Sequence, residues 1–256
     1  MTLSFPVSDA VLISTQAALA RLRKGAWALV PALSIALVVG WLALDPGAAS
    51  FLTYLALVAT PLLAAVALGY VVRGARPQWA LAVVPLLALA WAAKGSLVGQ
   101  AAALILTALG CLTLGWLLAA VAPRRLLELG IVVAAVVDSI LVFSNALSQP
   151  NATLNAAAPA AGLPQLQFAG FGSASMGYGD YFIAGVLGGV LLVAGRRSGP
   201  VALACLVFAA AFDLLFFVTD ELPATVPVAL ALIASEAASR WSATLWPVPA
   251  TQRTAK

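Results

Sequence analysis

Long apolar stretches separated by short polar segments dominate the chain, and most of them approach the length of a membrane-spanning helix. A helix needs about 20 apolar residues to cross the hydrocarbon core of a bilayer. The pattern predicts about eight spans, at 26–44, 51–72, 79–93, 100–121, 126–147, from between 171 and 180 to 195, 201–218 and 223–238. We expect residues 1–24, which are shorter and more polar in pattern, to lie at the membrane interface.

This pattern predicts an all-α, polytopic membrane protein with a single membrane domain over residues 1–256. Its parts would be an N-terminal cytoplasmic or interfacial segment (1–24), N-terminal helices (26–121), a second group of helices (126–240) and a cytoplasmic tail (241–256). Composition excludes a soluble protein, because the 256 residues are 63% hydrophobic and 9% charged, with a mean hydropathy of +1.06. Soluble domains carry about 25% charged residues.

The basic residues follow an alternating pattern along the predicted connections. Of the 13 lysines and arginines, all except Lys94 fall on one side of the predicted membrane domain. The positive-inside rule then places both termini in the cytoplasm and the Ser148–Gly170 loop outside. We expect the plasma or inner membrane of a prokaryote. The net charge of +4 is explained by this orientation and implies no nucleic-acid partner.

The residue types present limit the chemistry. The chain has no histidine, which excludes histidine-based triads and most zinc sites. Its two cysteines, Cys111 and Cys205, lie in apolar stretches without metal-like spacing. We therefore expect no metal and no cofactor.

Two aspartates within predicted spans are the main candidates for chemistry. A carboxylate at bilayer depth costs about 2.5–3.5 kcal/mol on insertion scales and usually marks a functional site. Counted from the cytoplasmic span ends, Asp138 and Asp180 lie at similar heights of about 18 and 22 Å, and Pro223 opens the last span from the same outer side. A carboxylate pair at that level would share a proton. One acid could activate water while the other protonates a carbonyl oxygen.

Two simpler interpretations of the acids stay open. Asp180 closes the run Gly177-Tyr178-Gly179-Asp180, and it could be an N-terminal helix cap at the interface. Asp213, in the seventh predicted span, could be a third functional acid, for which we favour a supporting role. We expect Glu128 and Glu236, at cytoplasmic span ends, to meet lipid headgroups or Arg125 and Arg240, respectively.

Three motifs in the second half of the chain resemble those of the presenilin and signal peptide peptidase family of intramembrane aspartyl proteases. The first is the run 137–143 around Asp138, in which Val137 replaces the family's tyrosine. The second is Ser175-Met176-Gly177-Tyr178-Gly179-Asp180, which matches the Gly-x-Gly-Asp element. The third is Pro223-Ala224-Thr225 in place of Pro-Ala-Leu. The resemblance covers about residues 126–240, and the order of the motifs is more specific than any one of them.

The resemblance implies a presenilin-like helical bundle in which Asp138 and Asp180 form the catalytic pair. It assigns substrate binding or shaping of the active site to Gly177, Tyr178, Gly179, Pro223, Ala224 and Thr225. It implies transmembrane peptides or remnant signal peptides as substrates, cleaved without a cofactor. A substrate helix would have to unwind, and could pair as a strand near the glycine-rich segment.

Other functional classes also fit the pattern. A proton-coupled transporter would use Asp138, Asp180 and Asp213 as a relay, although no convincing inverted repeat is present. A catalytically weakened membrane scaffold is favoured by the loss of the tyrosine. Prepilin peptidases also use Gly-x-Gly-Asp, but they usually carry a lysine where Phe182 stands here.

Overall fold

The computed structural model describes residues 46–72, 74–172, 174–219 and 221–245, which are predominantly helical. Within these residues, four helices are long and apolar enough to cross a membrane, Gly47–Val71, Leu97–Val121, Arg124–Phe143 and Ser198–Phe217. They indicate an integral membrane protein. Three further apolar helices are shorter, Pro77–Ala92, Tyr178–Val193 and Thr225–Ser239. The expected span at 26–44 and the segment 1–24 lie outside the described residues, so the number eight stays a prediction.

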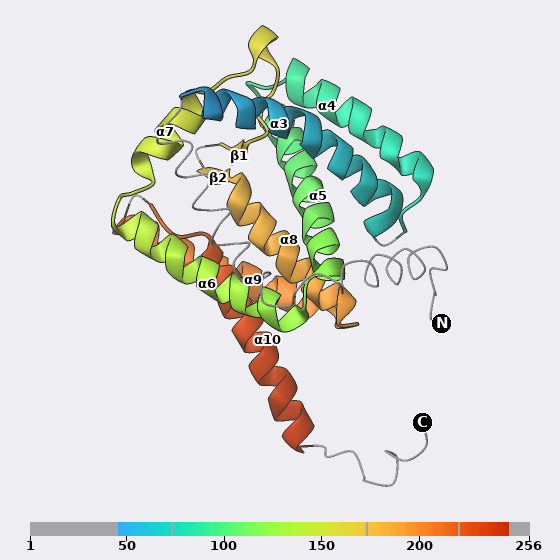
Figure 1. The fold of residues 1–256 in the computed structure, drawn as a ribbon, viewed down its shortest axis with the longest axis vertical. Coiled ribbons are helices and arrows are strands. Elements are labelled where there is room, and N and C mark those ends of the chain that lie inside the picture. Colours follow the sequence, from blue (N-terminus) through green and yellow to red (C-terminus); the bar gives the residue numbers. More distant parts are fainter. Residues whose placement is uncertain (1–45, 73, 173, 220, 246–256) are drawn as a thin grey trace.

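The N-terminal group of described helices packs along one side of the long helix α5 (Figure 1). Helix α3 (Pro46–Val66) runs into a π-helical turn at Ala67–Val71, and a 3₁₀ turn at Pro77–Ala82 leads into α4 (Val83–Ala92). Helix α5 (Leu97–Val121) begins after Ser96, whose hydroxyl accepts a hydrogen bond from the Gly99 N–H, as N-cap residues do. Small residues and leucines fill the space between α3, α4 and α5, among them Ala64, Ala90, Ala102 and Leu106.

Helix α6 (Arg124–Phe143) ends earlier than the predicted limit at residue 147. Asn145 adopts a left-handed conformation with φ 57°, and the Ala146 N–H donates to the Leu141 carbonyl. This is a common way to close a helix, because asparagine tolerates the left-handed region better than most residues do. The predicted span ran to residue 147 because the apolar pattern of the sequence does not record this helix end.

The connection between α6 and the next span contains more structure than the loop that we expected. It holds a short helix α7 (Ser148–Ala156), a 3₁₀ turn at Ala160–Gly162 and a β-hairpin of β1 (Phe168–Phe171) and β2 (Ala174–Gly177). The strands are antiparallel, with Phe168 opposite Gly177 and Phe171 opposite Ala174. The described residues are therefore mostly helical but not wholly so.

The last three helices complete a second group. Helix α8 (Tyr178–Val193) ends before Gly195, which has φ 65°, and α9 (Ser198–Asp213) continues into a 3₁₀ turn at Leu214–Phe217. Helix α10 (Thr225–Leu245) packs against α6, α8 and α9. Figure 1 shows α8 beside α5, so that α8 joins the two groups.

A continuous apolar core lies between α6, α8, α9 and α10. Its buried members include Ile131, Leu187, Val190, Ala231 and Leu232. Each of the three helices α6, α8 and α10 turns a stripe of residues spaced by three or four toward this core, as amphipathic helices do. Polar residues lie at both ends of these stripes, and so at both ends of the apolar core.

Candidate functional site

Asp138 lies on the buried face of α6. Leu127, Ile131 and Ala135 are buried at intervals of four residues, and Asp138 follows Ala135 by three. This spacing keeps the carboxylate on the face of α6 that packs against α8 and α10. Asp138 therefore lies about 21 Å along the helix axis from Arg124, at the opposite end of the apolar core.

Asp180 lies in the first turn of α8, directly after the hairpin. Gly177 precedes the helix, and a Cβ on this glycine would lie 3.5 Å from Oδ2 of Asp180. The carboxyl group thus folds back over the glycine at the helix start, in the manner of an acidic residue in a capping box. The N-cap residue of α8 is therefore Gly177, and Asp180 is the third residue of the helix rather than its cap.

Thr225 brings the third helix to these acids. Its hydroxyl donates a hydrogen bond of 2.6 Å to Oδ2 of Asp138, and its backbone N–H donates one of 3.3 Å to the same oxygen. Thr225 is buried at 4% exposure and opens α10. Pro223 is fully buried just before it, and Ala224 is half-buried. The structure thus joins Asp138 to Thr225 and places Asp180 at the start of α8, which packs against α6 and α10. We call Asp138 and Asp180 the dyad.

The glycine-rich segment before Asp180 is held at several points. Gly177 pairs with Phe168 in the hairpin, and the Tyr178 N–H donates to the Gln167 carbonyl at 3.3 Å. The Tyr178 carbonyl accepts a long hydrogen bond from Sγ of Cys111 on α5, at 3.8 Å. Strand β2, by contrast, is exposed at all four residues. Within the described residues only β1 pairs with β2, so one edge of β2 has no strand partner.

Hydrogen bonds from side chains of α3, of the residues before α5 and of the connection itself hold the segment around α7 in place. Lys94, the single exception to the charge pattern, donates from Nζ to the Gly162 carbonyl at 3.0 Å. Thr53 of α3 and Gln167 both donate to the Ala157 carbonyl, at 3.2 and 3.0 Å. The exceptional position of Lys94 is therefore explained by a contact with this connection.

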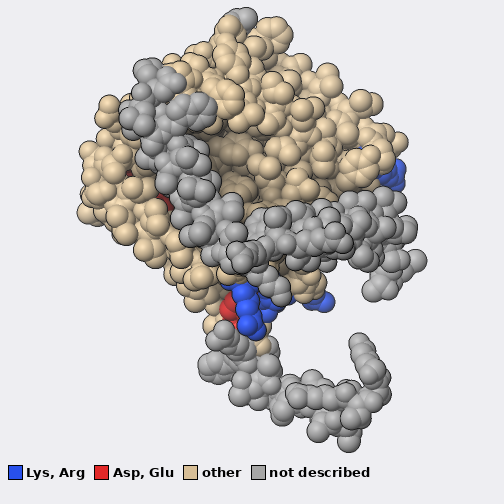
Figure 2. Space-filling view, in the orientation of Figure 1, with Lys and Arg blue, Asp and Glu red and all other residues tan. Residues whose placement is uncertain are grey.

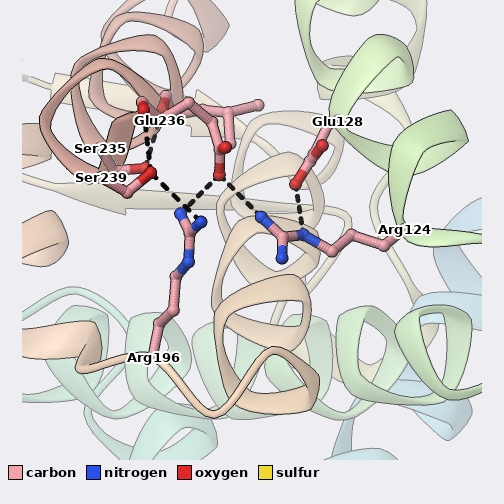
Figure 3. A network of polar contacts seen from close by, with 7 residues as sticks. Arg124, Glu128, Arg196, Ser235, Glu236 and Ser239 are labelled. Carbon is pink, nitrogen blue, oxygen red and sulfur yellow. Dashed lines mark hydrogen bonds and ion pairs between the residues drawn. The ribbon is translucent and has the colours of Figure 1, made fainter. Parts of the chain in front are cut away.

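A polar cluster closes the other end of the apolar core, and we call it the arginine network (Figure 3). Glu236 of α10 accepts from the guanidinium groups of Arg124 and Arg196, which point toward it from α6 and from the α8–α9 connection. Arg124 also pairs with Glu128 one turn further along α6. Our expectation of Arg125 as the partner of Glu128 was wrong, because the four-residue spacing from Arg124 brings the side chains together.

Charged side chains are sparse on the face seen in Figure 2, and most of them gather at its lower end. This distribution agrees with a surface that largely meets lipid. Within the described residues no group of three or more His, Cys, Asp or Glu side chains could hold a metal ion.

Asp213 does not join the dyad. It is the last residue of α9, its side chain is exposed, and within the described part of the chain no hydrogen bond or ion pair links it to Asp138 or Asp180. Its expected supporting role stays a prediction.

Sequence reasoning predicted arginine partners as one possibility for Glu128 and Glu236 but did not find Arg124 and Arg196. The expected pairing of Glu236 with Arg240 is not tested, because the side chain of Arg240 lies outside the described ones.

Comparisons of the chain with protein-family models, with curated proteins and with solved structures found no match.

Proposed function

We propose that this chain is an intramembrane aspartyl protease of the presenilin and signal peptide peptidase type. The observation that carries the proposal is the hydrogen-bonded contact of Asp138 with the start of α10, together with the position of Asp180 in the first turn of α8, a helix that packs against both α6 and α10. Two acids on neighbouring helices, with a helix start bonded to one of them, suit aspartyl proteolysis, in which two carboxyl groups act as base and acid. The Gly-x-Gly-Asp and Pro-Ala-Thr motifs support the same function.

The reaction requires only the dyad and one water. One carboxylate removes a proton from the water, whose oxygen attacks the carbonyl carbon of the peptide bond. The other carboxyl group gives its proton to the carbonyl oxygen, forming a gem-diol. The intermediate collapses when the C–N bond breaks and the leaving nitrogen takes up a proton from the dyad.

The surroundings of Asp180 support access for an extended peptide. Helix α8 is about 24 Å long, shorter than the hydrocarbon core of about 30 Å, and the β-hairpin occupies the chain before it. Irregular backbone at membrane depth is tolerated only next to protein or a wet cavity. The unpaired edge of β2 leads directly to Asp180, and it offers backbone groups to a substrate strand.

The orientation of the chain selects among substrates. With both termini in the cytoplasm and Ser148–Gly170 outside, the helices that carry the dyad cross the membrane in the same direction as those of signal peptide peptidases. We therefore propose substrates with a cytoplasmic amino terminus, including remnant signal peptides. Reporter fusions within α7 test this orientation, since a cytoplasmic signal from that helix contradicts the substrate assignment.

The decisive experiment is cleavage of a fluorogenic transmembrane peptide by the purified full chain. Asp138→Asn and Asp180→Asn keep the side-chain shape, and each should reduce cleavage to background. Asp213→Asn is the matched control, because it changes an acid outside the dyad. Full activity in both dyad variants, or loss only in Asp213→Asn, would refute the proposed site. A proton relay through Asp213 would instead require activity that depends on this acid as well as on Asp138 and Asp180, so the Asp213→Asn variant also tests the transporter interpretation.

A further inference from the structure

The two oxygens of the Asp138 carboxylate have different surroundings, because the start of α10 donates its hydrogen bonds to one of them. Both hydrogen bonds donated by Thr225 end on the same carboxylate oxygen, Oδ2. A backbone N–H can only donate, so Oδ2 acts as an acceptor. Two donors therefore point at Oδ2 and occupy its lone pairs, which leaves Oδ1 as the oxygen with room for a proton. Any proton that the dyad shares is then carried by Oδ1 or by Asp180.

From this geometry we infer that Thr225 is a positioning residue, whose hydroxyl fixes the Asp138 carboxylate so that Oδ1 is the oxygen that exchanges protons with water. The inference rests on the proposed proteolytic function and adds a residue to it. The 2.6 Å hydroxyl bond is short, as hydrogen bonds to a charged acceptor are. Thr225 is itself held by burial and by its place two residues after the fully buried Pro223.

A purely structural role is the competing explanation. Thr225 is the first residue of α10, and the first N–H groups of a helix lack partners within that helix. Asp138 could therefore do no more than cap α10 from the side of α6. A cap needs the backbone N–H, whereas positioning the carboxylate also needs the hydroxyl. Removal of the hydroxyl alone separates these two roles.

The test compares Thr225→Val, Thr225→Ser and the unmodified full chain in cleavage of the fluorogenic peptide. Valine keeps the shape and the N–H but removes the donor, and small displacements of catalytic groups cost up to about 100-fold in rate. We expect kcat to fall by about 10- to 100-fold in Thr225→Val, with KM little changed. Thr225→Ser, which restores the donor, should recover most of kcat.

Thr113→Val provides the matched control. Thr113 is also fully buried, and its hydroxyl donates to the Leu63 carbonyl at 2.8 Å, between α5 and α3. This variant should lower the unfolding temperature and leave kcat unchanged. A kcat for Thr225→Val within about twofold of the unmodified chain, or equal losses in the valine and serine variants, overturns the inference. Failure of the proposed function looks different, because the unmodified chain would then show no cleavage that depends on Asp138 and Asp180.

Discussion

Gly115 of α5 and Gly185 of α8 lie so close that neither position has room for a side chain. A Cβ on Gly115 would collide with the backbone of Gly185, and a Cβ on Gly185 would collide with the backbone around Cys111. Gly189, one turn after Gly185, meets Gly115 in the same way. Glycines spaced by four residues permit this approach of two helices in a membrane. The seam fixes α8, and with it Asp180, against α5.

Gly185→Ala should therefore destabilise the protein. The added methyl group meets backbone atoms that cannot turn away, and overpacking of this kind costs about 1–3 kcal/mol. Because Asp180 lies little more than one turn before Gly185 on α8, cleavage activity should fall as well. Thermal unfolding in detergent and the peptide-cleavage rate measure the two effects.

Gly188→Ala is the matched control on the same helix. A Cβ there would meet only the side chain of Leu112, at an ordinary distance of 3.7 Å. Alanine should be neutral or stabilise the helix by up to about 1 kcal/mol, because it favours helix more than glycine does. Equal unfolding temperatures for Gly185→Ala and Gly188→Ala would contradict the close seam.

The arginine network should stabilise the packing of α6 and α10 at the end of the apolar core away from Asp138. Glu236→Gln leaves Arg124 and Arg196 facing each other without their shared carboxylate. The side chains are about one quarter to two fifths exposed, so we expect a loss between the ~0–1 kcal/mol of surface pairs and the ~3–5 kcal/mol of buried ones. Chemical unfolding of the purified protein measures this loss.

Glu221→Gln removes the same charge from an exposed residue outside the network and is the control. It should leave the free energy of unfolding nearly unchanged. Added salt should reduce the difference between the two variants only in part, because partly buried pairs are screened less than exposed ones. No difference between Glu236→Gln and Glu221→Gln would refute a stabilising network.

The positions of the candidate acids were predictable to a useful degree. Asp138 lies seven residues after Ile131 and three after Ala135, a helical spacing that puts it on the same face as these buried residues, so the sequence pattern directs it toward the core. The first-turn position of Asp180 follows from the glycines before it. The hydroxyl bond of Thr225 was not predictable, because sequence spacing within α10 says nothing about which atom of α6 lies opposite its first residue.

The fold was predictable in its helices and less so in its connections. Apolar length indicates helices because every backbone polar group must be satisfied within the membrane. The β-hairpin and α7 lie in polar or glycine-rich sequence, where pairing depends on tertiary contacts such as those of Gln167 and Lys94. The early end of α6 depends on the left-handed conformation of Asn145, which the apolar pattern does not record.

Proline substitutions in β2 test the use of its unpaired edge by substrate. In a strand, neighbouring N–H groups point to opposite edges, so of Ser175 and Met176 one faces β1 and the other faces outward. Proline removes an N–H, and each substitution should reduce peptide cleavage. Only the proline that faces β1 should also lower the unfolding temperature. Equal cleavage by both variants and the unmodified chain would exclude strand pairing by the substrate.

The pH dependence of cleavage tests whether the two acids work as a pair. One acid must be ionised to activate water while the other is protonated, so kcat/KM should rise and then fall with increasing pH. Cleavage is lost on the acid side because the base becomes protonated, and on the alkaline side because the acid loses its proton. Initial rates in detergent, with unfolding temperatures measured at each pH, separate titration of the dyad from loss of the fold. A rate that rises with pH to a plateau, while the fold stays intact, would indicate a single titrating base and would contradict a shared proton between Asp138 and Asp180.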